Sequence, residues 1–134
     1  MAINGGCYCG AVRYEISGEA TFSGQCHCRE CQYITGGHPN VVMGVPEADF
    51  EYTAGTPQSF AREDLDAPVS REFCGKCGTH ILGRTPGMGL AIIKAGTLDD
   101  PSQFPGLQMA IFTCDAQPYH HIPDGVAAFE RTPG

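Results

Sequence analysis

Three cysteines stand within six residues of this chain, at Cys26, Cys28 and Cys31. Their C-x-C-x-x-C spacing lets one short turn direct three thiols at the same point, which packing alone does not require. Three protein ligands are the number that a catalytic zinc takes when its fourth position is kept for water or substrate. The segment therefore predicts a metal centre, and the rest of the sequence bears on whether a fourth protein ligand closes it.

A second cysteine pattern indicates a separate metal site. Cys74 and Cys77 have the C-x-x-C spacing of a zinc knuckle, and the glycine after each permits the backbone angles that such turns use. Because a structural zinc takes four ligands, we expect a second pair, and Cys7 and Cys9 supply it from more than sixty residues away. Two unrelated pairs or a redox dithiol are the alternatives, although no βαβ pattern surrounds the motif.

The compartment expected for this chain favours metal ligands over disulfides. Residues 1–6 have neither the basic region nor the apolar run of a signal peptide, and no stretch approaches the roughly 20 apolar residues of a membrane span. We therefore expect a cytoplasmic protein without a membrane partner, in which thiols stay reduced. Eight cysteines in that setting indicate metal binding, and a disulfide framework is the alternative.

The charge balance limits the partners. With 15 acidic and 8 basic residues the formal net charge is -7, so the surface lacks the basic face that nucleic acids need. An anionic small substrate would depend on one of the few cations. Arg29, beside the central cysteines, is the first candidate to meet a substrate carboxylate. A solvated arginine, or an ion pair with Glu30, is the alternative.

The composition favours a mainly β, loop-rich domain. Eighteen glycines and ten prolines interrupt the chain, and no window sustains the 3.6-residue period of a helix. Val12, Tyr14 and Ile16 alternate with Arg13 and Glu15, which predicts a strand with one buried face. Helical turns are expected at 29–34, ended by the glycines at 36 and 37, and at 46–50. We predict one domain over residues 1–134, with an irregular tail at 117–129 and antiparallel strands near 11–16, 21–25, 41–45, 50–52, 69–73, 80–82, 90–94 and 109–113.

A fourth ligand for the central cluster has several candidates. His27 lies between two expected ligands, so its side chain should project away from the ion and make hydrogen bonds. Five other residues could complete the site, each with a simpler structural role as the alternative: His38, His80, His120, His121 and Cys114. His38, in a Gly-Gly-His-Pro loop, is the first to consider. A closed site would make the chain a zinc-stabilised binding module without catalysis, whereas an open one favours an enzyme.

Several motifs together resemble one protein family. They are Gly-Cys7-x-Cys9-Gly-Ala-Val-Arg-Tyr-Glu, Cys26-His-Cys28-x-x-Cys31, Phe-Cys74-Gly-x-Cys77-Gly and a closing Ile-Pro-Asp-Gly at 122–125. This pattern covers nearly the whole chain and is similar to the glutathione-dependent formaldehyde-activating enzyme family, which includes the centromere protein V type domains. The resemblance implies an Mss4-like fold, in which small antiparallel sheets carry zinc at their edge.

The same resemblance implies an activity and roles for the cysteines. It implies a carbon–sulfur lyase that adds glutathione, or a similar thiol, reversibly to formaldehyde and gives S-hydroxymethylglutathione. The partner would be that small thiol, and a homodimer is compatible with the sequence. Two zinc ions per chain are implied, a structural one on Cys7, Cys9, Cys74 and Cys77 and a catalytic one on Cys26, Cys28 and Cys31.

The late part of the chain departs from the family pattern. Relatives often carry a histidine that leads the late strand and a Lys-Ala-Pro-Trp segment before the tail. This sequence has Ala110 at the first place and Ala116-Gln-Pro118-Tyr119 at the second. If those residues shape the thiol pocket, the substrate of this chain differs from that of its relatives. The candidates for a proton donor are Tyr33, His38 and Tyr119.

Overall fold

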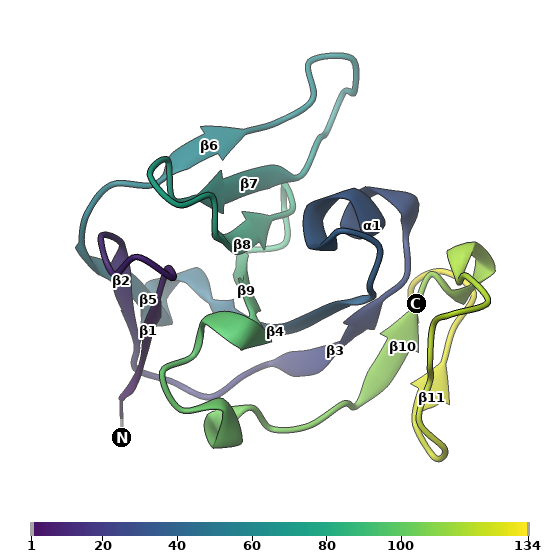
Figure 1. Ribbon diagram of the computed structural model, residues 1–134. Coiled ribbons are helices and arrows are strands. Elements are labelled where there is room, and N and C mark those ends of the chain that lie inside the picture. Colours follow the sequence, from purple (N-terminus) through teal and green to yellow (C-terminus); the bar gives the residue numbers. More distant parts are fainter. Residues whose placement is uncertain (1, 134) are drawn as a thin grey trace.

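Two β-sheets make up most of the computed structural model, which describes residues 2–133. A small antiparallel sheet has the order β1-β2-β5, with β1 at Ile3–Gly6, β2 at Arg13–Ile16 and β5 at Phe50–Ala54. An eight-stranded sheet has the order β11-β10-β3-β4-β9-β8-β7-β6 and bends around the helix α1 (Figure 1). Its strands are β3 (Phe22–Cys26), β4 (Asn40–Pro46), β6 (Gln58–Phe60), β7 (Ser70–Phe73), β8 (His80–Arg84), β9 (Leu90–Lys94), β10 (Met109–Ile111) and β11 (Ala127–Ala128).

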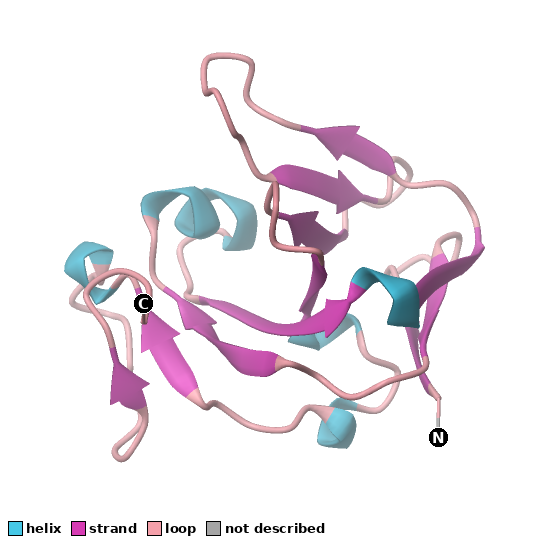
Figure 2. Ribbon diagram, turned by 180° about the vertical axis from the view of Figure 1, so that it is seen from behind, coloured by secondary structure: helices cyan, strands magenta, loops and turns pink. Residues whose placement is uncertain are grey.

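Helical structure is limited to short segments, as Figure 2 shows. Beside the α-helix α1 (Arg29–Thr35), the chain forms the 3-10 turns η1 (Glu47–Asp49), η2 (Ala95–Thr97), η3 (Pro101–Gln103) and η4 (Thr113–Asp115). The prediction of a mainly β fold with few helical turns is confirmed. Within residues 2–133, none of the helices has the length and hydropathy of a membrane-crossing segment.

The hydrophobic core lies under β2 and the middle of the large sheet. Val12, Tyr14 and Ile16 are all buried, whereas Glu15 is exposed, so the predicted alternation of β2 is confirmed. They pack with side chains from β4, β8 and β9, such as Ile93, which is fully buried. Burial of one such aliphatic side chain stabilises a fold by about 1.5–3 kcal/mol. The core also contains two cysteines, Cys7 and Cys74.

One part of the large sheet differs from the all-antiparallel prediction. Strand β10 runs parallel to both β3 and β11. A parallel pair needs a connection of a dozen residues or more, and the whole chain between β3 and β10 provides it. The close fit of the pair depends on Gly24, because a Cβ at that position would lie 2.5 Å from the Met109 carbonyl oxygen.

Helix α1 is bounded by local signals. The Cys28 side chain caps its first turn by accepting a hydrogen bond from the Cys31 amide at 3.3 Å. Gly36 ends it with φ 83, a left-handed conformation that glycine adopts without a steric cost. The helix and its end were thus predicted correctly, and its N-terminal cap is one of the central cysteines.

Candidate metal centres

Four cysteines from two distant turns meet at one point. Cys7 and Cys9 lie in the turn after β1, and Cys74 and Cys77 lie in the turn between β7 and β8. Their sulfurs are all within 4.8 Å of one another, and the Cys9 and Cys74 sulfurs are 3.8 Å apart. The two pairs come together, as expected from the four ligands of a structural zinc, and the four thiols can hold a metal ion.

Hydrogen-bond donors surround these four sulfurs. The Val12 amide donates to Cys7 Sγ at 3.2 Å, and the Cys77 amide donates to Cys74 Sγ at 3.4 Å. Thr79, whose hydroxyl lies 3.2 Å from Cys77 Sγ, lowers the pKa of that thiol to about 5. Such donors favour the thiolate, which is the form that binds a metal.

The three central cysteines meet where β3 leads into α1. Cys26 ends β3, Cys28 caps the helix and Cys31 lies in its first turn, with all three sulfurs within 4.8 Å of one another. Cys26 and Cys31 are buried, and Cys28 is half-buried. Over residues 2–133, no histidine, carboxylate or further cysteine belongs to this group. The three thiols can hold a metal ion, and within residues 2–133 no fourth residue of these types joins them.

The close approach of these thiols perturbs their ionisation. Hydrogen bonds with Cys26 and Cys28 lower the pKa of the Cys31 thiol. Hydrogen bonds with Cys28 and Cys31 raise the pKa of Cys26. The cluster thus readily carries one negative charge, and ionisation of all three thiols requires a cation to balance them.

Two polar residues that the sequence analysis did not single out stand behind Cys31. The Asn40 side-chain amide donates to Cys31 Sγ at 3.5 Å, and the Lys94 ammonium donates to Asn40 Oδ1 at 2.8 Å. Burial lowers the pKa of Lys94 to about 8, against the opposing attraction of Cys31. The register of β4 on β9, with Val42 opposite Lys94, brings the amine here. The sequence signal that could have pointed to this contact was Lys94 itself, a charged residue at the end of an otherwise apolar strand.

A chain of hydrogen bonds connects the cluster to the late part of the sequence. His27 is fully buried, and its Nε2 and Nδ1 lie 2.9 Å from Gln25 Nε2 and 2.8 Å from His120 Nδ1. His120 Nε2 lies 2.8 Å from the Gly37 carbonyl oxygen. Because the Gln25 amide donates to His27, the network assigns the His27 proton to Nδ1 and the His120 proton to Nε2. The prediction that His27 makes hydrogen bonds is confirmed.

The candidate fourth ligands lie outside the cluster. His38, the first candidate by sequence, is exposed, as are His121 and Cys114. His120 contacts His27, and His80 lines a pocket beside α1. In the part of the chain that the structure describes, none of the five belongs to the three-cysteine group.

Arg29 begins α1, directly after Cys28. Its guanidinium donates to Gln32 Oε1 and lies 5.1 Å from the centroid of the Tyr33 ring. The Glu30 carboxylate pairs with Arg71 at 3.2 Å, so its ion pair is made with the sheet and not with Arg29. Contact between Arg29 and a substrate carboxylate stays a prediction.

A comparison of this sequence with models of known protein families agrees with the cysteine geometry. The model of the family described as "Glutathione-dependent formaldehyde-activating enzyme" matches residues 2–115. The chain belongs to this family. All seven clustered cysteines of this family member lie inside the matched range.

Three curated relatives carry the name "Putative glutathione-dependent formaldehyde-activating enzyme". The one from Emericella nidulans is 31% identical over 80 residues, which are 58% of this chain and 40% of the relative. The one from Halomonas elongata is 27% identical over 86 residues, 60% of this chain and 55% of the relative. The one from Talaromyces marneffei is 25% identical over 126 residues, 90% of this chain and 66% of the relative. This family member thus spans between 40% and 66% of the length of these relatives.

A solved structure shares the fold. The crystal structure of a Rhodobacter sphaeroides protein matches with a TM-score of 0.60 at 18% identity, over 78% of this chain and 96% of that one. At this identity the likeness concerns the fold alone. Together with the two sheets described above, it confirms the mainly β architecture expected for the family.

Proposed function

We propose that this chain is a zinc-dependent carbon–sulfur lyase that joins a small thiol such as glutathione to a small aldehyde such as formaldehyde. The net reaction forms an S–C bond and moves the thiol proton to the aldehyde oxygen, and the reverse reaction breaks that bond. The family description supports the thiol and the aldehyde. One observation carries the proposal: three thiols lie within 4.8 Å of one another, without a fourth such ligand among residues 2–133.

The donor atoms fit two zinc ions of different kinds. Thiolate sulfur suits zinc, and four cysteines at one point are typical of a structural site, whereas three ligands are typical of a catalytic one. When bound at the three-cysteine cluster, zinc would lower the pKa of an incoming thiol, so that this thiol is present as a thiolate at neutral pH. The structural ion would be held by Cys7, Cys9, Cys74 and Cys77, and the catalytic ion by Cys26, Cys28 and Cys31.

The residues around the cluster hold its sulfurs and balance its charge. Asn40 fixes the Cys31 sulfur through an N–H donor, and Lys94 orients Asn40 in turn. The positive charge of Lys94 offsets part of the excess negative charge that three thiolates bring. Arg29, at the start of the same helix, is proposed to meet a carboxylate of the thiol substrate.

Two-dimensional exchange NMR on glutathione and formaldehyde tests the reaction. The zinc-loaded protein is expected to accelerate exchange between formaldehyde and S-hydroxymethylglutathione. Cys28→Ser should return the rate to the uncatalysed value, because a ligand of the proposed catalytic ion is lost. Cys114→Ser is the matched control and should keep the wild-type rate, since Cys114 is exposed and belongs to neither cluster. If the wild-type protein leaves the exchange rate unchanged, the named reaction is wrong.

A further inference from the structure

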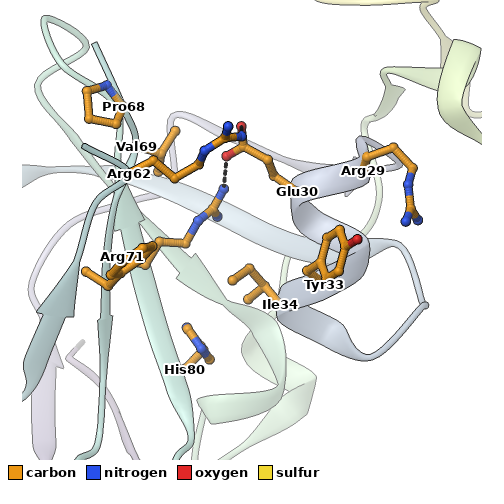
Figure 3. A pocket seen from close by; sticks show the side chains of 10 residues that line it. Arg29, Glu30, Tyr33, Ile34, Arg62, Pro68, Val69, Arg71 and His80 are labelled. Carbon is orange, nitrogen blue, oxygen red and sulfur yellow. Dashed lines mark hydrogen bonds and ion pairs between the residues drawn. The ribbon is translucent and has the colours of Figure 1, made fainter. Parts of the chain in front are cut away.

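A pocket of about 360 Å³ lies between α1 and the end of the large sheet formed by β6, β7 and β8. Figure 3 shows Arg62 and Arg71 converging on Glu30 at one wall, with Ile34 and His80 below them. The walls combine these polar groups with apolar side chains such as Val69. A ligand that fills this space therefore needs both an anionic group and an apolar part.

The pocket concentrates positive charge on an acidic protein. Three arginines line it against one carboxylate, whereas the whole chain carries a net charge of -7. Arg62 is already engaged, because it pairs with Asp64 at 2.6 Å and with Glu30 at 3.7 Å. Arg29 is turned toward Gln32. Arg29 is also exposed, whereas Arg71 is buried in the wall, so Arg71 is the cation best placed to bind a ligand inside the pocket.

The guanidinium of Arg71 is buried but sparsely bonded. Its side chain is 11% exposed, and within residues 2–133 it makes one side-chain hydrogen bond, from Nη2 to Glu30 Oε1 at 3.2 Å. The Glu30 carboxylate is shared with Arg62 and is 43% exposed. A guanidinium offers five N–H donors and prefers a planar anion such as a carboxylate, which accepts two of them at once.

His80 adds a polar ring to the wall of the same pocket. Its Nδ1 is buried and is the one buried side-chain nitrogen or oxygen without a hydrogen-bond partner over residues 2–133. Burial lowers the pKa of His80, and the charges of Lys94 and Arg71 lower it further. The imidazole is therefore neutral at neutral pH and can donate one hydrogen bond from a ring N–H. Nε2, the other ring nitrogen, makes no hydrogen bond within residues 2–133 and, unlike Nδ1, is not enclosed, so it is the atom of His80 that a ligand in the pocket can reach.

The pocket and the three-cysteine cluster share one helix. Glu30 and Ile34 line the pocket, and Cys31 lies between them in the sequence of α1. With a rise of about 1.5 Å per residue, the pocket wall begins within about 5 Å of Cys31 along the helix axis. An extended tripeptide spans about 10 Å, so its ends can reach both places.

We propose that this pocket binds a carboxylate of the thiol substrate, with Arg71 as the ion-pairing group and His80 as a second hydrogen-bonding partner. The thiol end of the same molecule then lies at the three-cysteine cluster, which shares α1 with the pocket. This inference rests on the proposed function, because it takes a carboxylate-bearing thiol such as glutathione as the substrate.

Binding of S-methylglutathione tests the pocket without the reaction, because its sulfur is blocked. Titration of the zinc-loaded protein, followed by amide NMR signals, should shift the signals of Glu30, Ile34, Arg71 and His80. Arg71→Gln should weaken binding by about 10- to 100-fold, the range expected for one charge-assisted contact. Esterification of both carboxylates of the probe should weaken binding to the wild type to the same extent.

Two further variants separate the pocket from a general loss of structure. Glu30→Gln removes the carboxylate that competes for Arg71, so it should tighten binding, whereas a disrupted fold would weaken it. Arg131→Gln makes the same charge change as Arg71→Gln at an exposed place in the tail and should bind as the wild type does. If Arg71→Gln does not fold, Arg71→Lys replaces it and should weaken binding several-fold through loss of the planar contact.

The outcomes distinguish the pocket from the reaction. Equal affinities for the Arg71 and Arg131 variants, or signal shifts confined to other residues, would overturn the pocket proposal even if exchange of glutathione and formaldehyde is catalysed. Binding at these residues without catalysis of exchange would support the pocket and overturn the reaction. Weaker binding of S-methylglutathione by the Glu30→Gln variant than by the wild type would also overturn the pocket proposal.

Discussion

The sulfur of Cys31 is positioned by residues from two strands as well as by its own helix. Asn40 from β4 donates to it, and Lys94 from β9 donates to Asn40. A group that hydrogen-bonds to a metal-ligating side chain fixes the orientation of that side chain and tunes the charge on its ligand atom. Asn40 therefore connects the metal cluster to the buried cation, and neither residue belongs to a recognisable motif.

Replacement of Asn40 by alanine tests this role. The Asn40→Ala variant should bind zinc at the three-cysteine cluster about 10- to 100-fold more weakly, because Cys31 loses its N–H donor and Lys94 loses its acceptor. Competition with a chromophoric chelator measures the affinity of this site. Asn4→Ala, at an exposed position of β1, is the control and should keep the wild-type affinity. Equal affinities for both variants would show that Asn40 has no influence on the metal.

At the scale of elements, α1 places two sites on one short helix. Its seven residues are too few for a stable isolated helix, so its position depends on its ends and on packing. Cys28 caps one end and Gly36 closes the other in a left-handed conformation. These two caps therefore help to fix the positions of both Cys31 and the pocket residue Ile34.

Substitution of Gly36 should therefore destabilise the protein. Gly36→Ala forces a Cβ into a backbone with φ 83 and is expected to cost about 1 kcal/mol of unfolding free energy. Gly96→Ala is the matched control, because no atom lies within 4 Å of the added Cβ and the residue is not among those with positive φ. It should change stability by no more than about 0.5 kcal/mol. Urea denaturation compares the two, and a similar loss for both would contradict the role of the left-handed cap.

At the scale of the whole molecule, the four-cysteine cluster joins the two sheets. One pair follows β1 of the small sheet, and the other connects β7 and β8 of the large one. Cys7 and Cys74 are also part of the hydrophobic core. A metal ion held there would add its binding energy to folding, whereas the three-cysteine cluster joins only β3 to the adjacent helix.

Loss of one ligand from each cluster should therefore have different consequences. Cys77→Ser is expected to lose one zinc ion and more than about 3 kcal/mol of stability, because the clamp between the sheets opens. Cys28→Ser is expected to lose one zinc ion with a smaller loss of stability. Metal analysis and thermal denaturation measure both effects. Fewer than two zinc ions in the wild-type protein, or equal losses of stability, would contradict the assignment of one structural and one catalytic ion.

Local patterns predicted most of the secondary structure. The alternation in residues 12–16, the glycines after α1 and the apolar run of β9 were sufficient, because each acts on its immediate neighbours. The parallel placement of β10 was not predicted, since no local pattern distinguishes a parallel partner from an antiparallel one. It depends on a close approach of Gly24 to Met109, which are far apart in the sequence.

The sequence alone determined which atoms can bind metal. Thiol spacing is a local property, so it grouped Cys26, Cys28 and Cys31 and defined two further pairs, whereas the meeting of those two pairs is a property of the tertiary structure. Only the tertiary structure decided what surrounds them: the Asn40 and Lys94 contacts, the pairing of His27 with His120, and the pocket with Arg71. These residues come from strands and loops that are far apart in the sequence and lie together in the folded chain. The physical reason is that charge and hydrogen bonding act through space, whereas a sequence records only neighbours along the chain.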